Sequence, residues 1–159
     1  MARCLTWAAL MLGSGAFAGA VHAQAVCNVG ATGLAFGLYT MTKQPPTTTV
    51  GTITVSCSAP TATTVSYTLA LSGGAPMDLR SRSMALGGRP LPYQLFLDPA
   101  LTQVWGDGGE GTNVASVANV PLSPGVTDRR SFLVYGRIPG RYPAASGIYQ
   151  DNVTIVLNY

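Results

Sequence analysis

The chain has 159 residues and a formal net charge of +3, and only 9% of its residues are charged while 47% are hydrophobic. Soluble domains usually carry about 25% charged residues, so we expect neighbouring subunits to cover part of the surface. The basic residues are dispersed apart from the pairs Arg80/Arg82 and Arg129/Arg130, which we interpret as solvated turn residues. This distribution excludes the basic patch of a nucleic-acid-binding protein.

The first 23 residues have the features of a secretory signal peptide. Arg3 supplies the positive charge, an apolar stretch runs from Leu5 to Ala20, and Val21-His22-Ala23 forms a small-residue cleavage pattern. We therefore predict a signal peptide over residues 1–23 and one secreted domain over residues 24–159. That length suits a single domain with a sizeable core.

Three alternatives apply to this N-terminal segment. Cleavage after Ala18 would give a mature start at Gly19. A retained membrane anchor is disfavoured, because the apolar stretch is short for a span of about 20 residues. Lipid modification of Cys27 is also disfavoured, because Gln24-Ala25-Val26 is a poor lipidation context.

Removal of the signal peptide takes Cys4 with it and leaves Cys27 and Cys57. In the oxidising compartment to which a signal peptide leads, pairing is the default, so we predict a Cys27–Cys57 disulfide. Such a bond would stabilise the fold by roughly 3–4 kcal/mol on the chain-entropy model. The alternatives are two free thiols or a metal pair, which would lack further ligands.

Short alternating runs separated by Gly, Pro and Ser predict an all-β sandwich or barrel. The first run is Leu34–Tyr39, and residues 43–49 are expected to form a loop because they contain Pro45-Pro46 and three threonines. Two clear strands follow at Val50–Cys57 and Thr64–Ser72. Alternation assigns their buried faces to Gly51, Ile53, Val55 and Cys57, and to Val65, Tyr67, Leu69 and Leu71.

The second half of the chain is expected to continue as strands and loops. Residues 75–90 predict a long connection with a short strand at Ser83–Leu86, followed by a strand at Leu91–Leu97. Short strands at Thr102–Trp105 and Asn113–Val120 flank the turn-rich Gly106–Gly111 segment. Ser131–Ile138 alternates, with Phe132, Val134, Gly136 and Ile138 on one face. After a loop over residues 139–146, the last strand is predicted at Gly147–Tyr159.

The sequence predicts neither an enzyme nor a cofactor site. His22 is the only histidine and leaves with the signal peptide, so the mature chain has none for a general base, a nucleophilic triad or a metal. Asp107, Glu110 and Asn113 could ligate Ca²⁺, although Asp107-Gly108 is also ordinary turn chemistry. Trp105 could stack on a sugar, although its spacing suits packing in a core or turn equally well.

Motifs spread through the chain resemble those of the spore coat protein U domain family, which includes subunits of archaic chaperone–usher pili. The matching segments are Cys27-Asn28-Val29, Leu34–Tyr39, Gly51–Cys57, Tyr67–Gly74, Arg82-Ser83-Met84, Leu91–Asp98, Trp105–Gly108, Val134–Pro139 and Gly147–Ile155. Each one alone is weak, but their order and spacing together are specific.

This resemblance implies an immunoglobulin-like β-sandwich that lacks its last strand. It also implies partners: a periplasmic chaperone that lends a strand, an outer-membrane usher, and other pilus subunits, with no nucleic acid and no small-molecule substrate. A donated strand would supply main-chain hydrogen bonds and fill pockets with alternate side chains. We expect Val153, Ile155, Leu157 and Tyr159 to form one wall of the acceptor groove, and Leu34, Phe36 and Leu38 the other. The alternative is that both sets are core positions of a complete sandwich.

The sequence departs from a polymerising subunit at its N-terminus. Only Gln24, Ala25 and Val26 precede Cys27 after the predicted cleavage, too few for a donor segment. We therefore expect a structural or adhesive pilus subunit at the cell surface, of the tip or acceptor-only kind, used in attachment and biofilm formation. The alternatives are a secreted spore or cell coat protein of the same fold, and a carbohydrate- or calcium-binding module.

Overall fold

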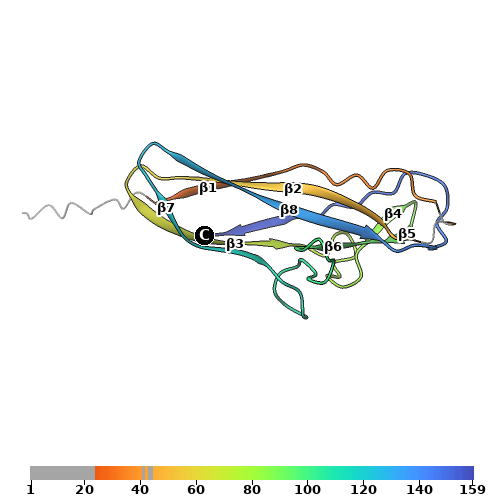
Figure 1. Cartoon of the computed structure of the whole chain (residues 1–159). Helices are drawn as coiled ribbons and strands as arrows, with labels where there is room; N and C mark the ends of the chain where they lie inside the picture. The colour runs from red at the N-terminus through yellow and green to blue at the C-terminus, as the bar shows by residue number, and fades with distance from the viewer. Residues whose placement is uncertain (1–23, 41, 43–44) are drawn as a thin grey trace, which may run out of the picture.

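Antiparallel strands form two facing layers in the computed structural model of the chain, which describes residues 24–40, 42 and 45–159 (Figure 1). The predicted signal peptide, residues 1–23, lies outside the described residues. One sheet has the order β1-β2-β8-β6, the second has the order β7-β3-β9, and β4 and β5 form a hairpin. The strand bounds are β1 Val26–Ala31, β2 Thr47–Ser58, β3 Thr63–Leu71, β4 Ser83–Leu86, β5 Arg89–Pro92, β6 Gln94–Phe96, β7 Ala115–Leu122, β8 Thr127–Ile138 and β9 Ile155–Asn158. The prediction of an all-β, immunoglobulin-like sandwich is confirmed.

The core lies between the two sheets and is built by the alternation of β2, β3 and β8. Every position predicted to face inward on β2 and β3 is buried. On β8 the residues Val134, Gly136 and Ile138 are buried, while Phe132 is half-buried. Alternate residues of a strand point to opposite faces, so these three strands each place a full row of side chains in the core.

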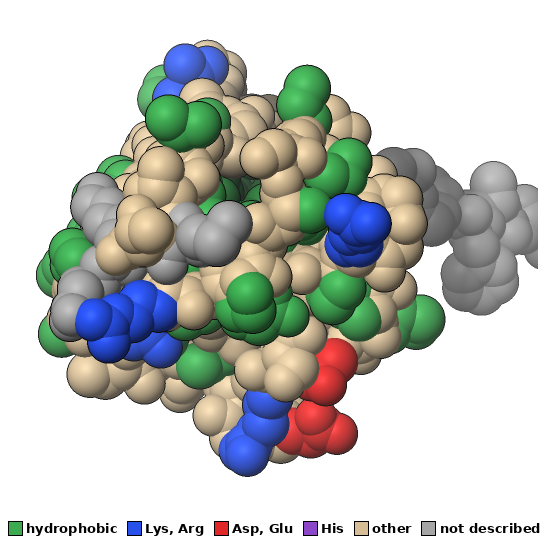
Figure 2. Space-filling view, turned by 90° about the vertical axis from the view of Figure 1, so that its right-hand side faces the viewer, with side chains coloured by type: hydrophobic (Ala, Val, Ile, Leu, Met, Phe, Trp, Pro, Cys, Tyr) green, Lys and Arg blue, Asp and Glu red, His purple; other side chains and the backbone are tan. Residues whose placement is uncertain are grey.

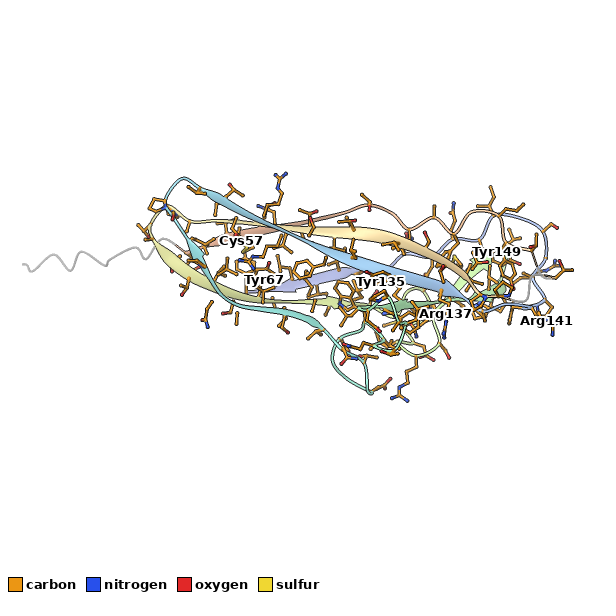
Figure 3. All side chains as sticks on the ribbon, in the orientation of Figure 1. Cys57, Tyr67, Tyr135, Arg137, Arg141 and Tyr149 are labelled. Carbon is orange, nitrogen blue, oxygen red and sulfur yellow. A yellow bond between two sulfur atoms is a disulfide. The ribbon has the colours of Figure 1, made fainter. Side chains whose placement is uncertain are left out.

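A disulfide joins β1 to β2 at one end of the sandwich. Cys27 and Cys57 lie directly opposite each other in the antiparallel register, and their sulfur atoms are 2.05 Å apart. Figure 3 shows Cys57 at the end of the molecule opposite Tyr149. The predicted pairing is confirmed, and it anchors the start of the first strand.

Three predicted segment boundaries near the first sheet are wrong. The first strand is Val26–Ala31, whereas residues 34–39 have no regular strand pairing. β2 begins at Thr47, so the threonines assigned to a loop extend this strand, as β-branched residues favour. The predicted strand Leu91–Leu97 is divided between β5, which pairs with β4, and β6, which pairs with β8.

The remaining strands follow the predictions in part. β4 coincides with the predicted Ser83–Leu86. Thr102–Trp105 contributes only isolated bridges at Val104 and Trp105, and β7 lies slightly later than predicted. The last strand is regular only over Ile155–Asn158, although Gln150 still forms a bridge with Ala85.

Arg82 is a correction to the sequence analysis, since it is fully buried rather than solvated. Its guanidinium donates to the Ser72 carbonyl, at 2.8 and 3.0 Å, and to the Trp105 carbonyl at 2.8 Å. It also donates to Gln94 Oε1. From inside the core, Arg82 therefore holds together three segments. They are the segment that follows β3, the strand β6 and the loop that follows β6.

The two long sides of the sandwich differ. On the side of β6 and β7, the loop over residues 97–114 hydrogen-bonds to both sheets. The Trp105 N–H donates to the Leu95 carbonyl, and the Leu71 N–H donates to the Gly106 carbonyl, each at 2.9 Å. On the other side, β1 and β9 are the outermost strands of their sheets. The core is covered by this loop on the first side, whereas the second side has only the edge strands β1 and β9 and the segments that adjoin them.

Candidate functional site

A long groove runs along the side of the sandwich on which β1 and β9 are the edges. It consists of two adjoining hollows of about 610 and 640 Å³. Leu34, Phe36, Met84 and Tyr149 line both hollows, so the two are continuous. We call residues 31–40 the first wall and residues 147–155 the second wall of this groove.

The core forms the floor of the groove. Ile53, Leu71, Tyr93, Leu95 and Val134 lie beneath the first hollow, and all five are buried. Leu91 and Ile138 lie beneath the second hollow. The groove is therefore an opening into the apolar interior and not a polar surface cleft.

Apolar side chains that point toward the groove remain half-buried, although they alternate as core residues do. Leu34 and Phe36 on the first wall are half-buried and separated by exposed Ala35. Val153, Ile155 and Leu157 show the same pattern on the opposite side, where exposed residues separate them. All five pack against the core and remain partly buried. The large inward-facing residues of β2 and β3 are, by contrast, buried almost completely.

The structure brings together most, but not all, of the seven residues predicted for the two walls. Leu34, Phe36, Val153 and Ile155 line the groove, and Leu157 continues the second wall without lining either hollow. Leu38 lines the second hollow but is 90% exposed, so it lies on the rim. Tyr159 is 58% exposed and lines neither hollow. Four of the seven residues therefore line the hollows within the groove, and the role of all seven in accepting a strand stays a prediction.

One end of the groove carries two prominent apolar side chains. Leu38 from the first wall and Ile148 from the second both line the second hollow, and Ile148 is 76% exposed. Figure 2 looks at this end of the molecule and shows apolar side chains interspersed with well-separated basic ones. Exposed apolar groups on both walls indicate that this end of the groove suits an apolar partner.

A hydrogen bond connects the floor to the second wall. The Tyr93 hydroxyl donates to Asp151 Oδ2 at 2.6 Å, and the backbone N–H groups of Ala75 and Asn152 donate to Asp151 Oδ1, each at 2.8 Å. Burial, together with this bond to a carboxylate, raises the pKa of Tyr93 far above its ordinary value. Among the described residues, Asp151 is the one charged side chain that lines the groove.

Tyr149 occupies the junction of the two hollows. Its hydroxyl oxygen is buried and has no hydrogen-bond partner within the described part of the chain. This hydroxyl is therefore free to donate a hydrogen bond to an acceptor that enters the groove.

Met84, Tyr93, Tyr149 and Asp151 are groove residues that the sequence analysis missed. Tyr149 and Asp151 lie within the predicted last strand, so their place on the second wall follows from the same alternation that selected Val153. Met84 and Tyr93 come from β4 and from the break between β5 and β6, and no local pattern connects these segments to the walls.

The structure does not support Trp105 as a surface on which a sugar could stack. Trp105 is 0% exposed, and its indole N–H donates to the Leu69 carbonyl at 2.9 Å. The side chain is therefore a core residue and cannot stack on a sugar in solution. This overturns the version of the carbohydrate-binding alternative that rested on Trp105.

The Asp107 loop has the hydrogen bonds of a turn. Asp107 Oδ1 accepts from the Gly109 N–H at 2.7 Å, and the Thr112 hydroxyl donates to the Gly109 carbonyl at 2.7 Å. Within residues 24–40, 42 and 45–159, no group of three His, Cys, Asp or Glu side chains gathers as a metal site would require. The carboxylate of Asp107 thus organises its own loop, as an Asx-turn does.

The described part of the chain contains no helix of the length and apolar character needed to cross a bilayer.

Comparison with known proteins assigns the family. The pattern of the Spore Coat Protein U domain matches residues 14–156. No curated protein matches the sequence. Among solved structures, the chain resembles one from the CsuC–CsuE chaperone–tip adhesion subunit pre-assembly complex of the archaic chaperone–usher Csu pili of Acinetobacter baumannii, with a TM-score of 0.58 and 24% identity. The alignment covers 86% of this chain and 40% of that chain, so the present chain spans well under half of it. This likeness supports the fold, and because the domain pattern covers almost the whole sequence, the chain belongs to the Spore Coat Protein U domain family.

Proposed function

We propose that this protein is a structural or adhesive subunit of an extracellular pilus, and that its groove accepts a β-strand from a second polypeptide. The strand comes first from a periplasmic chaperone and then from a neighbouring subunit, and an outer-membrane usher exports the product to the cell surface. The family membership and the structural likeness to a chaperone–subunit complex support this proposal.

The single observation that carries the proposal is the half-burial of alternating apolar residues on both walls. Leu34, Phe36, Val153 and Ile155 present apolar side chains to a continuous groove above the core. Burying one such side chain fully contributes about 1.5–3 kcal/mol relative to leaving it exposed. An occupant with apolar side chains at alternate positions would complete the burial of all four.

The edges of the groove suit a strand rather than a globular ligand. β1 and β9 are the outermost strands of their sheets, and within the described residues each pairs with one other strand only. The groove extends from Ala31 and Ile155 at one end to Leu38 and Ile148 at the other. About eight residues of extended chain, roughly 26 Å, span that length.

An added strand would also provide hydrogen bonds. Exposed strand edges present N–H and C=O groups that can pair with another chain, which is the basis of strand addition. A main-chain carbonyl of the same strand would be a suitable acceptor for the unpartnered Tyr149 hydroxyl. A single strand would therefore provide both apolar cover for the wall residues and acceptors for hydrogen bonds.

The position of the subunit in the fibre is part of the proposal. The predicted mature chain has three residues before Cys27, so we propose that it accepts a strand but does not donate one, which suits a tip subunit in attachment and biofilm formation. N-terminal sequencing of secreted protein tests this part, since a mature start well before Gly19 would provide a donor segment.

Strand acceptance is tested with synthetic peptides of about nine residues in which leucine alternates with threonine. Binding should raise the melting temperature and slow hydrogen exchange of the second-wall amides, residues 147–155, that make no hydrogen bond within the described part of the chain. The matched control is a peptide of the same composition with its leucines in one block, which cannot place them along both walls and should give neither effect.

The same experiment separates the proposal from its alternative. A coat protein that does not use strand exchange would be recovered from the periplasm as a monodisperse monomer, and its second-wall amides would already be protected without peptide. That result would contradict strand acceptance and would leave the secreted β-domain and its family unaffected.

A further inference from the structure

Two glycines beneath the first wall occupy positions where a strand would normally carry a side chain. Gly51 lies on β2 and Gly136 lies on β8, and both are at inward-facing positions of neighbouring strands. Glycine weakens a strand and often marks a place where another part of the chain approaches closely. Neither glycine has the positive φ that only glycine tolerates well, so backbone conformation does not explain their presence.

The first wall occupies the space that these glycines leave. A β-carbon built on Gly136 would lie 2.8 Å from Phe36 Cζ and 3.0 Å from Leu34 Cδ2. One built on Gly51 would lie 2.9 Å from Leu34 Cγ. Carbon atoms in good contact are about 3.5–4.0 Å apart, so any side chain at either position would displace the wall.

Phe36 in turn contacts the group that reaches the second wall. Its ring packs edge-to-face against Tyr93, with ring centroids 6.1 Å apart and an interplanar angle of 66°. The Tyr93 hydroxyl donates to Asp151 on the second wall. A continuous series of contacts, Gly136–Phe36–Tyr93–Asp151, thus crosses the floor of the groove from one wall to the other.

We infer that Gly136, with Gly51, is a specificity-determining residue that sets the width of the groove by determining how deeply Phe36 and Leu34 sit. This inference rests on the proposed strand acceptance. Phe36 lines both hollows, so a Phe36 side chain raised by about 1 Å moves into the space an occupant would use. Because Phe36 lies deep in the wild type, there is room for a large apolar side chain of the donated strand at the point where the strand passes Phe36.

The test uses a Gly136→Ala variant and the alternating leucine peptide, together with a series in which one leucine at a time is replaced by alanine. We expect the variant to bind the all-leucine peptide about fivefold or more weakly, because over-packing a tight contact costs at least about that factor. The peptide whose alanine faces Phe36 should be the exception. Its affinity for Gly136→Ala should be less than about threefold lower than its affinity for the wild type.

Gly30→Ala is the matched control. Gly30 lies on β1, has no atom within 4 Å of the position its β-carbon would take, and does not have a positive φ. This variant should bind every peptide as the wild type does. Adding Phe36→Ala to Gly136→Ala should relieve the contact and restore the binding of the all-leucine peptide to the level of Phe36→Ala alone.

Two further measurements keep the inference testable whatever the stability of the variant. Nuclear Overhauser contacts between the Phe36 and Tyr93 rings should weaken in Gly136→Ala. Phe36→Trp, which fills the same space from the other side, should show the same selective loss if Gly136→Ala does not fold.

The outcomes distinguish this inference from the proposal beneath it. If no peptide binds the wild type, strand acceptance fails and the inference fails with it. If the wild type binds but Gly136→Ala weakens all peptides equally, or weakens none, strand acceptance stands and Gly136 does not set the width of the groove.

Discussion

The Tyr93 hydroxyl donates a hydrogen bond of 2.6 Å to Asp151, although the two residues are 58 positions apart in the chain. Tyr93 is buried in the floor of the groove and Asp151 lies on its second wall. The bond therefore fixes the irregular part of the second wall, residues 147–154, to the core. Two backbone hydrogen bonds with Ala85 and one from the Ser72 N–H to the Thr154 carbonyl also hold this segment, although regular pairing begins only at Ile155.

Tyr93→Phe should destabilise the protein by about 1.5–3 kcal/mol, because a hydrogen bond to a charged group contributes that much to stability. The ring and its contact with Phe36 are retained, so the loss reports the hydroxyl alone. Urea unfolding followed by tryptophan fluorescence measures the change, with Trp105 as the buried probe. A shift of less than about 0.5 kcal/mol would mean that Asp151 is held adequately by its backbone donors.

Alkaline pH should reduce stability through the same residue. Burial and the bond to Asp151 raise the pKa of Tyr93 above that of the unfolded chain, which is about 10. The stabilisation is therefore complete below pH 10 and is lost as the pH rises toward the pKa in the folded state, because only the unfolded chain loses its proton in that range. The free energy of unfolding, measured by urea titration at successive pH values, should decline above about pH 10.

Tyr93→Phe provides the control for this pH dependence. Burial also raises the pKa of Tyr67, so the variant should flatten the alkaline decline without abolishing it. A decline of the same slope in the variant and the wild type would assign the effect to other groups.

Features of this structure that arise from neighbouring residues of one segment can be predicted from the sequence, whereas features that arise from contacts between distant segments cannot. Val50–Cys57 was predicted with the correct buried face because alternation within one strand is a local property. Leu34–Tyr39 alternates equally well, yet these residues form no regular strand. Gly37 has φ +69, outside the extended region, and interrupts the segment.

The candidate site divides in the same way. Wall residues such as Phe36 and Ile155 follow from alternation along single segments, and the structure places them on the groove. Met84 and Tyr93 reach the groove only because the β4–β5 hairpin packs beneath it, which depends on contacts between distant segments. Arg82 could not be predicted as buried, since most of its acceptors are main-chain carbonyls, which the order of side chains does not reveal.

Arg82→Ala should destabilise the protein by about 3 kcal/mol or more. The substitution leaves the Ser72 and Trp105 carbonyls buried without their donor, and an unsatisfied buried group costs about 1–3 kcal/mol. Arg82→Lys should recover only part of the loss, because an ammonium cannot place several planar donors at fixed angles. Both values come from urea unfolding.

Arg130→Ala is the matched control for the loss of an arginine. Its ion pair with Asp128, at 3.0 Å, is on the surface, so the expected change is less than about 1 kcal/mol. If Arg82→Ala were equally mild, the interior contacts of its guanidinium would contribute little to stability.

Removal of the disulfide should destabilise the chain without dissolving the groove. Cys27 and Cys57 are 30 residues apart, and the chain-entropy model assigns such a loop roughly 3–4 kcal/mol. The Cys27→Ala/Cys57→Ala double variant avoids a lone reactive thiol and should show that loss in urea unfolding. The disulfide lies at the start of β1. The first wall is held further along the chain, where the Thr49 hydroxyl donates to the Ala35 carbonyl and where Leu34 and Phe36 pack on Gly51 and Gly136. The variant should therefore bind the alternating peptide with unchanged affinity at temperatures where it remains folded, and a selective loss of binding would show that the cross-link positions the first wall.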